Sequence, residues 1–364
     1  MSSAATVPDV TLIELGGWPA VLGPLTSGRD LTVAQVTAAV TTILEGAATS
    51  AQMAAFAVGL RMKGETVEEM GALLDVLVAF GERVELGTGI DAVDTCGTGG
   101  DRSCTINAST VAALVVAGAG APVCKHGNRS QSSQCGSADL LEALGVAVSL
   151  RPQGVVACVA QAGMGFCFAP RYHPAFRHVG PTRRELGVPT VFNFLGPVAN
   201  PAGVRRQVLG VSDPAMAANL VGLLQARGSE RALVVYGHDG LDELSTITTS
   251  TVLELRDGEV RTYDVDPARL GLKPATLEDI QGGDPATNAD LARRVLDGEA
   301  GARRDFVLLN AAAGLVAAGV ADNLADGLAA ATASVDEGRA ATVLDRLVKA
   351  SAEQAREENE ADAG

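Results

Sequence analysis

The sequence predicts an α/β protein in two parts, a small N-terminal helical domain and a larger α/β domain with a mostly parallel central sheet. Two observations predict it. Three capping-box patterns follow one another before residue 80, with no strand pattern between them. From residue 92 onward, short strand-like runs alternate with helical runs, which is typical of parallel sheets covered by helices. We expect domains at 1–85 and 86–350, and an acidic tail at 351–364 that is a frayed helix end or disordered.

The helical domain is predicted from helix starts. The capping boxes are Thr32-x-x-Gln35, Thr49-x-x-Gln52 and Thr66-x-x-Glu69. After the first, apolar residues recur at helical spacing until Gly46 ends the run; they are Val33, Val36, Val40, Ile43 and Leu44. We expect helices from about 173–200 to complete this domain.

The elements of the α/β domain follow in chain order. Strands are expected at 92–95, 121–125, 190–193 and 232–236. Helices are expected at 108–121 (buried and rich in Ala, Val and Gly), 138–144, 306–320 and 323–349, with a surface excursion at 261–284. Three of the four strands lead directly into loops rich in glycine and polar residues, and ligands of parallel sheets gather at such carboxyl ends.

Composition excludes several classes of protein. The chain has 364 residues, a net charge of −15 and only 3% aromatic residues, which argues against a nucleic-acid partner. No apolar stretch is long enough to cross a membrane, and the N-terminus lacks the pattern of a signal peptide. The six cysteines include no CxxC pair and are expected to be reduced. A cytoplasmic protein is expected.

The first candidate site is the glycine loop GTGGD at 97–101. No Gly-Lys dipeptide occurs, so it is not a Walker A loop, and Arg102 stands where a dinucleotide fingerprint needs its third glycine. Taken alone, the loop could be a simple tight turn. Hydrogen-bonding side chains follow it and favour a phosphate site instead; they are Thr105, Asn107, Ser109 and Thr110.

The second candidate is KHGNRS at 125–130, which follows the next strand. Lys125 and Arg129 can neutralise negative oxygens, and nearby hydroxyls can donate to them; these are Ser130, Ser132, Ser133 and Ser137. The alternative is a solvated surface loop, which a second anion loop at a neighbouring strand end makes less attractive.

An acidic pair and an arginine pair complete the set. Asp242 and Glu243, in DGLDE after the strand at 232–236, could hold Mg²⁺, although a lone pair of this kind is more often a solvated turn. Arg183 and Arg184, in PTRRELG, offer a guanidinium suited to bidentate binding of a carboxylate.

Five motifs occur in order: DTCGTGGD, NAST, KHGNRSQSSQCGSADLLEALGV, FAPRYHPAFRHVGPTRRELGVPTVFNFLGPVANP and VYGHDGLDELS. From about residue 32 to 349 the chain resembles the anthranilate phosphoribosyltransferase family. The resemblance implies a nucleoside phosphorylase-like fold and a homodimer. It implies transfer of the 5-phosphoribosyl group from 5-phosphoribosyl 1-diphosphate (PRPP) to anthranilate, with Mg²⁺, expected at two ions per subunit.

The resemblance also assigns residues. PRPP would be bound by Gly97, Gly100, Asp101, Thr105, Asn107, Ala108, Ser109, Thr110, Lys125, His126, Gly127, Asn128, Arg129, Ser130, Gln131, Ser132, Ser133 and Ser137. Anthranilate would contact Gly97, Asn128 and Arg183, the first arginine of its motif, with His126 and residues 172–174 lining its approach. Mg²⁺ would be held by Ser109, Asp242 and Glu243. His126 is the one candidate proton acceptor.

The chain departs from the family pattern at three positions, Arg102, Ala108 and Cys135, none of which is an assigned charge. Two rival interpretations stay open. A pyrimidine nucleoside phosphorylase shares the fold but does not need the acidic metal pair. A non-catalytic relative that binds nucleic acid should have lost these carboxylates and gained a basic face.

Overall fold

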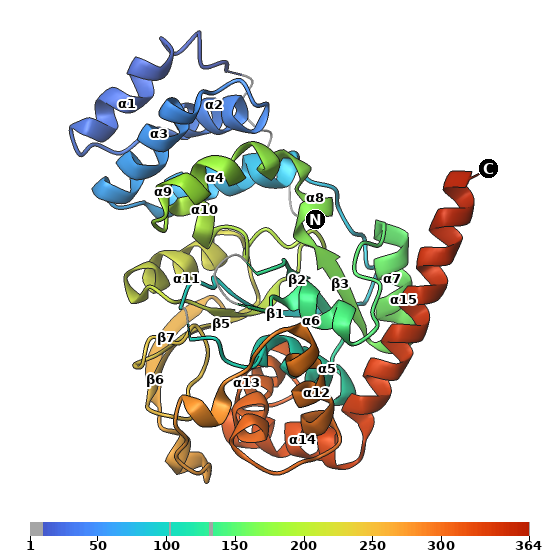
Figure 1. Cartoon of the computed structure of the whole chain (residues 1–364). Coiled ribbons are helices and arrows are strands. Elements are labelled where there is room, and N and C mark those ends of the chain that lie inside the picture. The colour runs from blue at the N-terminus through green and yellow to red at the C-terminus, as the bar shows by residue number, and fades with distance from the viewer. Residues whose placement is uncertain (1–9, 102, 131–133, 364) are drawn as a thin grey trace.

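The computed structural model describes residues 10–101, 103–130 and 134–363. The helical domain begins with α1 (Trp18–Thr26), α2 (Val33–Leu44), α3 (Ser50–Lys63) and α4 (Val67–Ala79). All three predicted capping boxes are confirmed, because Thr32, Thr49 and Thr66 are the N-caps of α2, α3 and α4. This domain lies at the top of Figure 1, above the sheet of the α/β domain.

Four short elements from the middle of the chain pack with the helical domain. They are α8 (Ala169–Tyr172), the 3₁₀ helix η1 (Pro174–His178), α9 (Gly180–Leu186) and α10 (Val191–Phe194). Both α9 and α10 contact α3, and η1 contacts α2. The strand predicted at 190–193 is wrong. Thr190 starts a helical turn there, because its backbone N–H donates to Asn193 Oδ1 at 3.0 Å and the apolar side chains enter the helical core.

The α/β domain contains one seven-stranded sheet. In chain order its strands are β1 (Val93–Gly97), β2 (Val123–Gly127), β3 (Met164–Phe168), β4 (Arg206–Gly210), β5 (Arg231–Gly237), β6 (Ser250–Arg256) and β7 (Glu259–Val265). The spatial order is β3-β2-β1-β4-β5-β6-β7, with β1 to β5 parallel and the last two antiparallel. The excursion expected at 261–284 therefore begins inside an edge strand, and a turn at residues 257–258 joins β6 to β7.

Eight helices cover this sheet in the described part of the chain. They are α5 (Ala108–Gly118), α6 (Ser137–Ala143), α7 (Pro152–Ala162), α11 (Ala217–Ala226), α12 (Pro285–Leu296), α13 (Ala302–Ala318), α14 (Leu324–Asp336) and α15 (Arg339–Ala363). Three short 3₁₀ helices join them: η2 (Pro214–Met216), η3 (Pro267–Leu270) and η4 (Glu278–Ile280).

The C-terminal region differs from its prediction. The single helix expected at 323–349 is two helices, because Gly338 adopts a left-handed conformation (φ 70°) that ends the first. The acidic end is neither frayed nor disordered up to Ala363, since α15 continues through it and packs against α7. Glu358 Oε1 accepts the Arg151 N–H at the start of α7 at 2.8 Å, which fixes the two helices together.

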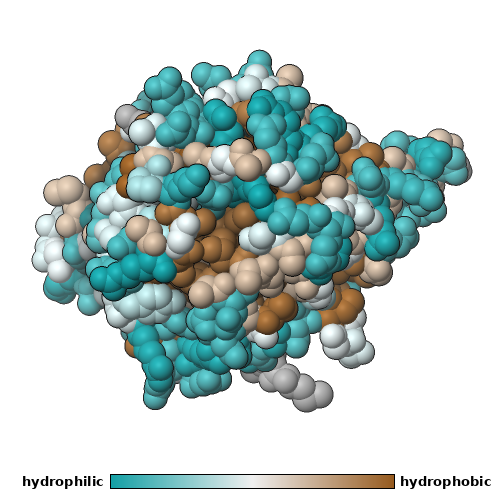
Figure 2. Space-filling model, turned by 90° about the horizontal axis from the view of Figure 1, so that it is seen from below, coloured by the Kyte–Doolittle hydropathy of each residue, from teal (hydrophilic) through white to brown (hydrophobic). Residues whose placement is uncertain are grey.

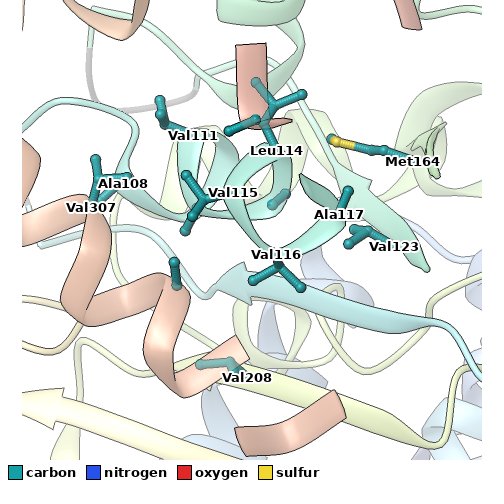
Figure 3. Packing of buried hydrophobic residues seen from close by; sticks show 14 of the residues in the cluster. Ala108, Val111, Leu114, Val115, Val116, Ala117, Val123, Met164, Val208 and Val307 are labelled. Atoms are coloured by element: carbon teal, nitrogen blue, oxygen red, sulfur yellow. The ribbon is translucent and has the colours of Figure 1, made fainter. Parts of the chain in front are cut away.

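The core has two parts, one on each face of the sheet. On one face α5 is buried along nearly its whole length against α13, β1 and β2, and α13 packs in turn on β4, so that Val115, Val116, Val208 and Val307 belong to one cluster (Figure 3). On the other face, α11 and the helical domain share a second cluster. The helix predicted at 108–121 is thus confirmed, and its buried N-terminal end is fixed at the edge of the sheet.

The surface on the side of α14 carries a largely apolar groove. Seen from below, apolar side chains gather in a shallow hollow ringed by hydrophilic ones (Figure 2). A mostly apolar groove lies along α14, which packs on the C-terminal half of α5, where the Ser334 hydroxyl donates to Val115 O. All six cysteines are free thiols. Among the described residues, no helix combines the length and apolarity that crossing a bilayer requires.

Candidate functional site

Three loops meet at the carboxyl ends of the parallel strands. The chain proceeds outward from β1 through β2 to β3 and then returns to β4 on the other side of β1. The gap between β1 and β4 is therefore the point where strand order reverses, which is where open α/β sheets bind ligands. The glycine loop, the 128–137 loop and the DGLDE loop follow β1, β2 and β5.

The DGLDE loop crosses directly over the ends of β1 and β4. The Gly99 N–H donates to Asp242 Oδ2 at 2.7 Å. A Cβ on Gly97 would lie 2.3 Å from that oxygen, and a Cβ on Gly210 would lie 1.5 Å from the Asp242 carbonyl oxygen. Glycine is needed at both positions because the loop approaches the strand backbone so closely. Gly210 was not predicted, since one glycine at the end of one strand gives no signal in a single sequence.

The acidic pair is held between the two loops. Glu243 Oε1 accepts the Ser109 N–H in the first turn of α5 at 3.3 Å. Burial raises the pKa of Asp242 to about 7, helped by the nearby charge of Asp101, and raises the pKa of Glu243 well above its usual range. Neither carboxylate forms an ion pair within the described ranges. Two half-buried acids without a direct ion-pair partner among the described residues are a site that a cation would stabilise.

The donor set fits Mg²⁺ in particular. In the part of the chain that the structure describes, no three His, Cys, Asp or Glu side chains gather as a complete metal site. Mg²⁺ is commonly bound by one or two carboxylates, with waters and substrate phosphates completing the octahedron. Asp242, Glu243 and the Ser109 hydroxyl can supply that protein share.

Lys125 lies beneath the site and does not face solvent. It is 1% exposed, and its ammonium donates to the Thr95 carbonyl on β1. Its positive charge also acts on the fully buried carboxylate of Asp94, which accepts a hydrogen bond from Asn200 Nδ2 at 2.8 Å. Lys125 was predicted to be a cation of the loop after β2, and this placement is wrong, because the residue lies within β2 itself. Its charge acts on the acidic pair from inside the sheet and not from the loop. Asp94 was missed, although a charged residue inside an apolar strand was a usable signal.

The 128–137 loop is tied to the start of α5. Asn107 Nδ2 donates to the Cys135 carbonyl at 2.8 Å, and Asn288 Nδ2 donates to Asn107 Oδ1 at 2.9 Å. The Ser137 hydroxyl donates to the Asn128 carbonyl at 3.1 Å. The loop and the glycine loop therefore lie side by side, as two phosphate loops would. Gln131, Ser132, Ser133 and Arg102 lie outside the described residues.

The other predicted phosphate-site residues surround the same helix start. Asp101 accepts from the Ser103 N–H and hydroxyl, which shapes the glycine loop. Thr105 forms a short β-bridge with Gln281, and Ala108 is buried in the first turn of α5. The Thr110 hydroxyl is buried without a partner among the described atoms, so it could donate to a ligand. Gly100 lies in the loop after β1, and Gly127 is the last residue of β2.

The expected acceptor side lies where the helical domain meets β2. The rings of His126 and His173 contact each other edge to face, with centroids 5.2 Å apart. Arg183 packs over the Phe176 ring at 6.0 Å, and its buried Nε has no partner among the described atoms. Burial lowers the pKa of Arg183, whereas Arg184 is exposed. An unpaired, partly desolvated guanidinium suits a carboxylate ligand.

Known proteins are similar in sequence to this chain along about nine tenths of its length. The model of the helical bundle domain of a glycosyl transferase family matches residues 19–81, and that of the family's a/b domain matches residues 89–341. The anthranilate phosphoribosyltransferase of Rhodococcus jostii is 51% identical over 335 residues, which cover 90% of this chain and 92% of that one. The chain belongs to the anthranilate phosphoribosyltransferase family.

Other members of this family agree in sequence and structure. The anthranilate phosphoribosyltransferase of Salinispora arenicola is 49% identical, covering 91% of this chain and 96% of its own. The crystal structure of the Thermus thermophilus enzyme matches with a TM-score of 0.85 at 40% identity, over 91% and 98% of the two chains. The Saccharomyces cerevisiae enzyme in complex with PRPP and Mg matches with a TM-score of 0.84 at 26% identity, over 92% and 98%.

Proposed function

We propose that this chain transfers the 5-phosphoribosyl group of PRPP to the amine of anthranilate, releasing pyrophosphate, as a step of tryptophan biosynthesis. The observation that carries the proposal is the acidic pair. Asp242 accepts an N–H from the glycine loop and Glu243 accepts one from the first turn of α5, and neither has an ion-pair partner among the described side chains. A divalent ion shared with a diphosphate would complete this arrangement.

The donor substrate would lie across the β1–β4 gap. The Thr110 and Ser109 hydroxyls and the 128–137 loop would hold phosphate oxygens, and Lys125 would raise the positive potential from below. Asp242, Glu243 and Ser109 would hold Mg²⁺, two ions per subunit, which when bound would neutralise charge on the departing pyrophosphate. We propose that activity depends on Mg²⁺.

The acceptor would be oriented by Arg183 and Asn128, close to Gly97. The aromatic amine of anthranilate is weakly basic and already neutral near pH 7, so no strong base is required to activate it. His126 is poorly suited to that role, because burial and the neighbouring His173 lower its pKa to about 3. We propose that His126 stays neutral and packs with His173 along the acceptor's approach. Catalysis then comes mainly from positioning and electrostatics.

The setting of the protein is also part of the proposal. We propose a homodimer that works in the cytoplasm without a nucleic-acid or membrane partner. Sedimentation equilibrium of the purified chain would measure the dimer, and a mass equal to one chain at micromolar concentration would contradict it.

The decisive experiment follows anthranilate fluorescence in the purified protein with PRPP and MgCl₂, and then with each omitted. Loss of signal that needs PRPP and stops on chelation would support the transferase. If no condition gives a loss, cleavage of uridine by phosphate would test the pyrimidine nucleoside phosphorylase alternative. Retention on heparin at moderate salt would favour a nucleic-acid-binding relative.

A further inference from the structure

Arg129, the exposed cation of the 128–137 loop, is held by two acids of α6. Its Nη1 lies 2.9 Å from Asp139 Oδ1 and 2.5 Å from Glu142 Oε2, and its Nη2 lies 2.8 Å from Glu142 Oε1. The guanidinium also lies over the Phe168 ring, at 5.4 Å. Two carboxylates against one guanidinium leave this cluster with a net charge of −1. A phosphate approaching it therefore meets an arginine that is already paired.

The two acids do different work. Asp139 accepts the Ser130 N–H at 3.1 Å and the Gly136 N–H at 2.9 Å, so it fixes both ends of the loop. Glu142 makes its side-chain hydrogen bonds, within the described ranges, to Arg129 alone, and that pairing is bidentate. Its side chain is 40% exposed, compared with 18% for Asp139. Glu142 can therefore leave Arg129 without disturbing the loop backbone.

The loop that carries Arg129 is tied to the start of α5. Cys135, at the far end of the same loop, accepts from Asn107 at 2.8 Å, and Asn107 directly precedes the helix whose first turn contacts Glu243. A diphosphate held near Asp242 and Glu243 would lie close to this loop. Its oxygens offer Arg129 the same bidentate geometry that Glu142 offers now.

We propose that Glu142 is a built-in competitor of PRPP: its carboxylate occupies Arg129 until a substrate phosphate displaces it, and this exchange sets the affinity for PRPP. The inference rests on the proposed function. The exchange is easily reversible because an exposed pair of this kind contributes little net stability. Asp139 keeps the arginine near the loop in both states. Glu142 thus sets the affinity for PRPP without touching the substrate.

The test is the isosteric substitution Glu142→Gln. We expect the KM for PRPP to fall about two- to fivefold, the range in which an exposed ion pair competes. The kcat and the KM for anthranilate should stay within about twofold of the original values, because the loop anchor Asp139 is retained. In an Arg129→Gln background the same substitution should have no effect, since the competed cation is gone.

A matched control exists in the same chain. Arg294, in the last turn of α12, pairs in a bidentate manner with Glu299 just beyond that helix, with side-chain exposures of 49% and 50%. Asn288, which contacts the site, lies in the first turn of α12, so the pair is at the opposite end of the helix. Glu299→Gln should leave the KM for PRPP unchanged. Binding of inorganic pyrophosphate with Mg²⁺, measured by calorimetry, should tighten in Glu142→Gln and not in Glu299→Gln.

Two results would overturn the inference while the unaltered protein is active. An unchanged KM for PRPP in Glu142→Gln would mean that Arg129 is not competed for. A raised KM would mean that Glu142 holds the loop in its binding shape. Failure of the proposed function is distinguishable, because the unaltered protein would then consume no anthranilate under any condition.

Discussion

Replacing Gly210 by alanine should disable the acidic site while leaving the fold in place. The added Cβ would lie 1.5 Å from the Asp242 carbonyl oxygen, whereas real Cβ atoms stay 3.0 Å or more from such atoms. The DGLDE loop must therefore shift by about 1.5 Å, because the strand beneath it is fixed in the sheet. A shift of that size breaks the 2.7 Å bond from Gly99 to Asp242 and moves Glu243 from α5.

The expected loss is large because the loop carries the proposed metal ligands Asp242 and Glu243. A displacement of about 1 Å at a reacting centre can cost about 100-fold in rate, so we expect kcat/KM to fall by about 100-fold or more. The half-saturating Mg²⁺ concentration should rise as well. Anthranilate fluorescence, measured across a MgCl₂ series, gives both quantities.

The control is a milder clash in a strand away from the site. A Cβ on Gly165 in β3 would lie 2.7 Å from a Val159 side-chain atom. Gly165→Ala should lower the melting temperature without changing the Mg²⁺ requirement. Wild-type kcat and Mg²⁺ dependence in Gly210→Ala would refute the reasoning, since the loop would then be shown to tolerate the shift.

Three further substitutions test the charges of the site. Arg183→Ala should raise the KM for anthranilate about ten- to a hundredfold, because a charge-assisted hydrogen bond is lost, and the KM for PRPP far less; equal effects, or the same effect in the exposed control Arg184→Ala, would contradict the assignment. Asp242→Asn should raise the half-saturating Mg²⁺ concentration about tenfold or more and leave the melting temperature unchanged. An unaltered half-saturating Mg²⁺ concentration would disprove this. His126 is neutral when folded (pKa about 3, against 6.5 as the reference). Below pH 6.5 the unfolded chain gains a proton that the folded chain does not, so the free energy of unfolding should fall by about 2 kcal/mol from pH 8 to 5 through this residue. His126→Gln should reduce that slope in urea titrations, and an equal slope would refute it.

Local sequence signals predicted the capped helix starts and the strands β1, β2 and β5, whereas β3, β4, β6 and β7 were not predicted. Thr32, Thr49 and Thr66 start helices because the bonds of a capping box are made within four residues. The segment at 190–193 was misjudged since β-branched and aromatic residues suit a strand, whereas tertiary packing placed Phe192 and Phe194 in the helical core. The break at Gly338 depends on one left-handed residue within a long helical pattern.

The site was predictable in its motifs but not in its pairings. The sequence predicted that Asp242 and Glu243 follow the end of a strand. It did not predict that Gly210 lies under Asp242, because Gly210 ends β4 whereas Asp242 lies in the loop after β5. Lys125 and Arg129 read as two equivalent loop cations. In the structure one is buried under the sheet edge, and the other is bound by α6. The position of Lys125 in β2 buries it, whereas ion pairs with α6 hold Arg129 at the surface, so the two cations have different roles.

The distribution of unpaired charge then suggests how two substrates are kept apart. Among the residues that the structure describes, two acids at the β1–β4 gap have no ion-pair partner, and Arg183, on α9 beside the helical domain, has no acidic partner. Unpaired, partly buried charges cost stability, and a ligand of opposite sign relieves that cost only where it binds. Under the proposed function, a metal–diphosphate complex would relieve the first cost and a carboxylate the second, and neither ligand would serve at the other's position. The reactants would thereby be sorted by charge before their reacting atoms meet, which would place the neutral amine at the anomeric carbon without a base to direct it.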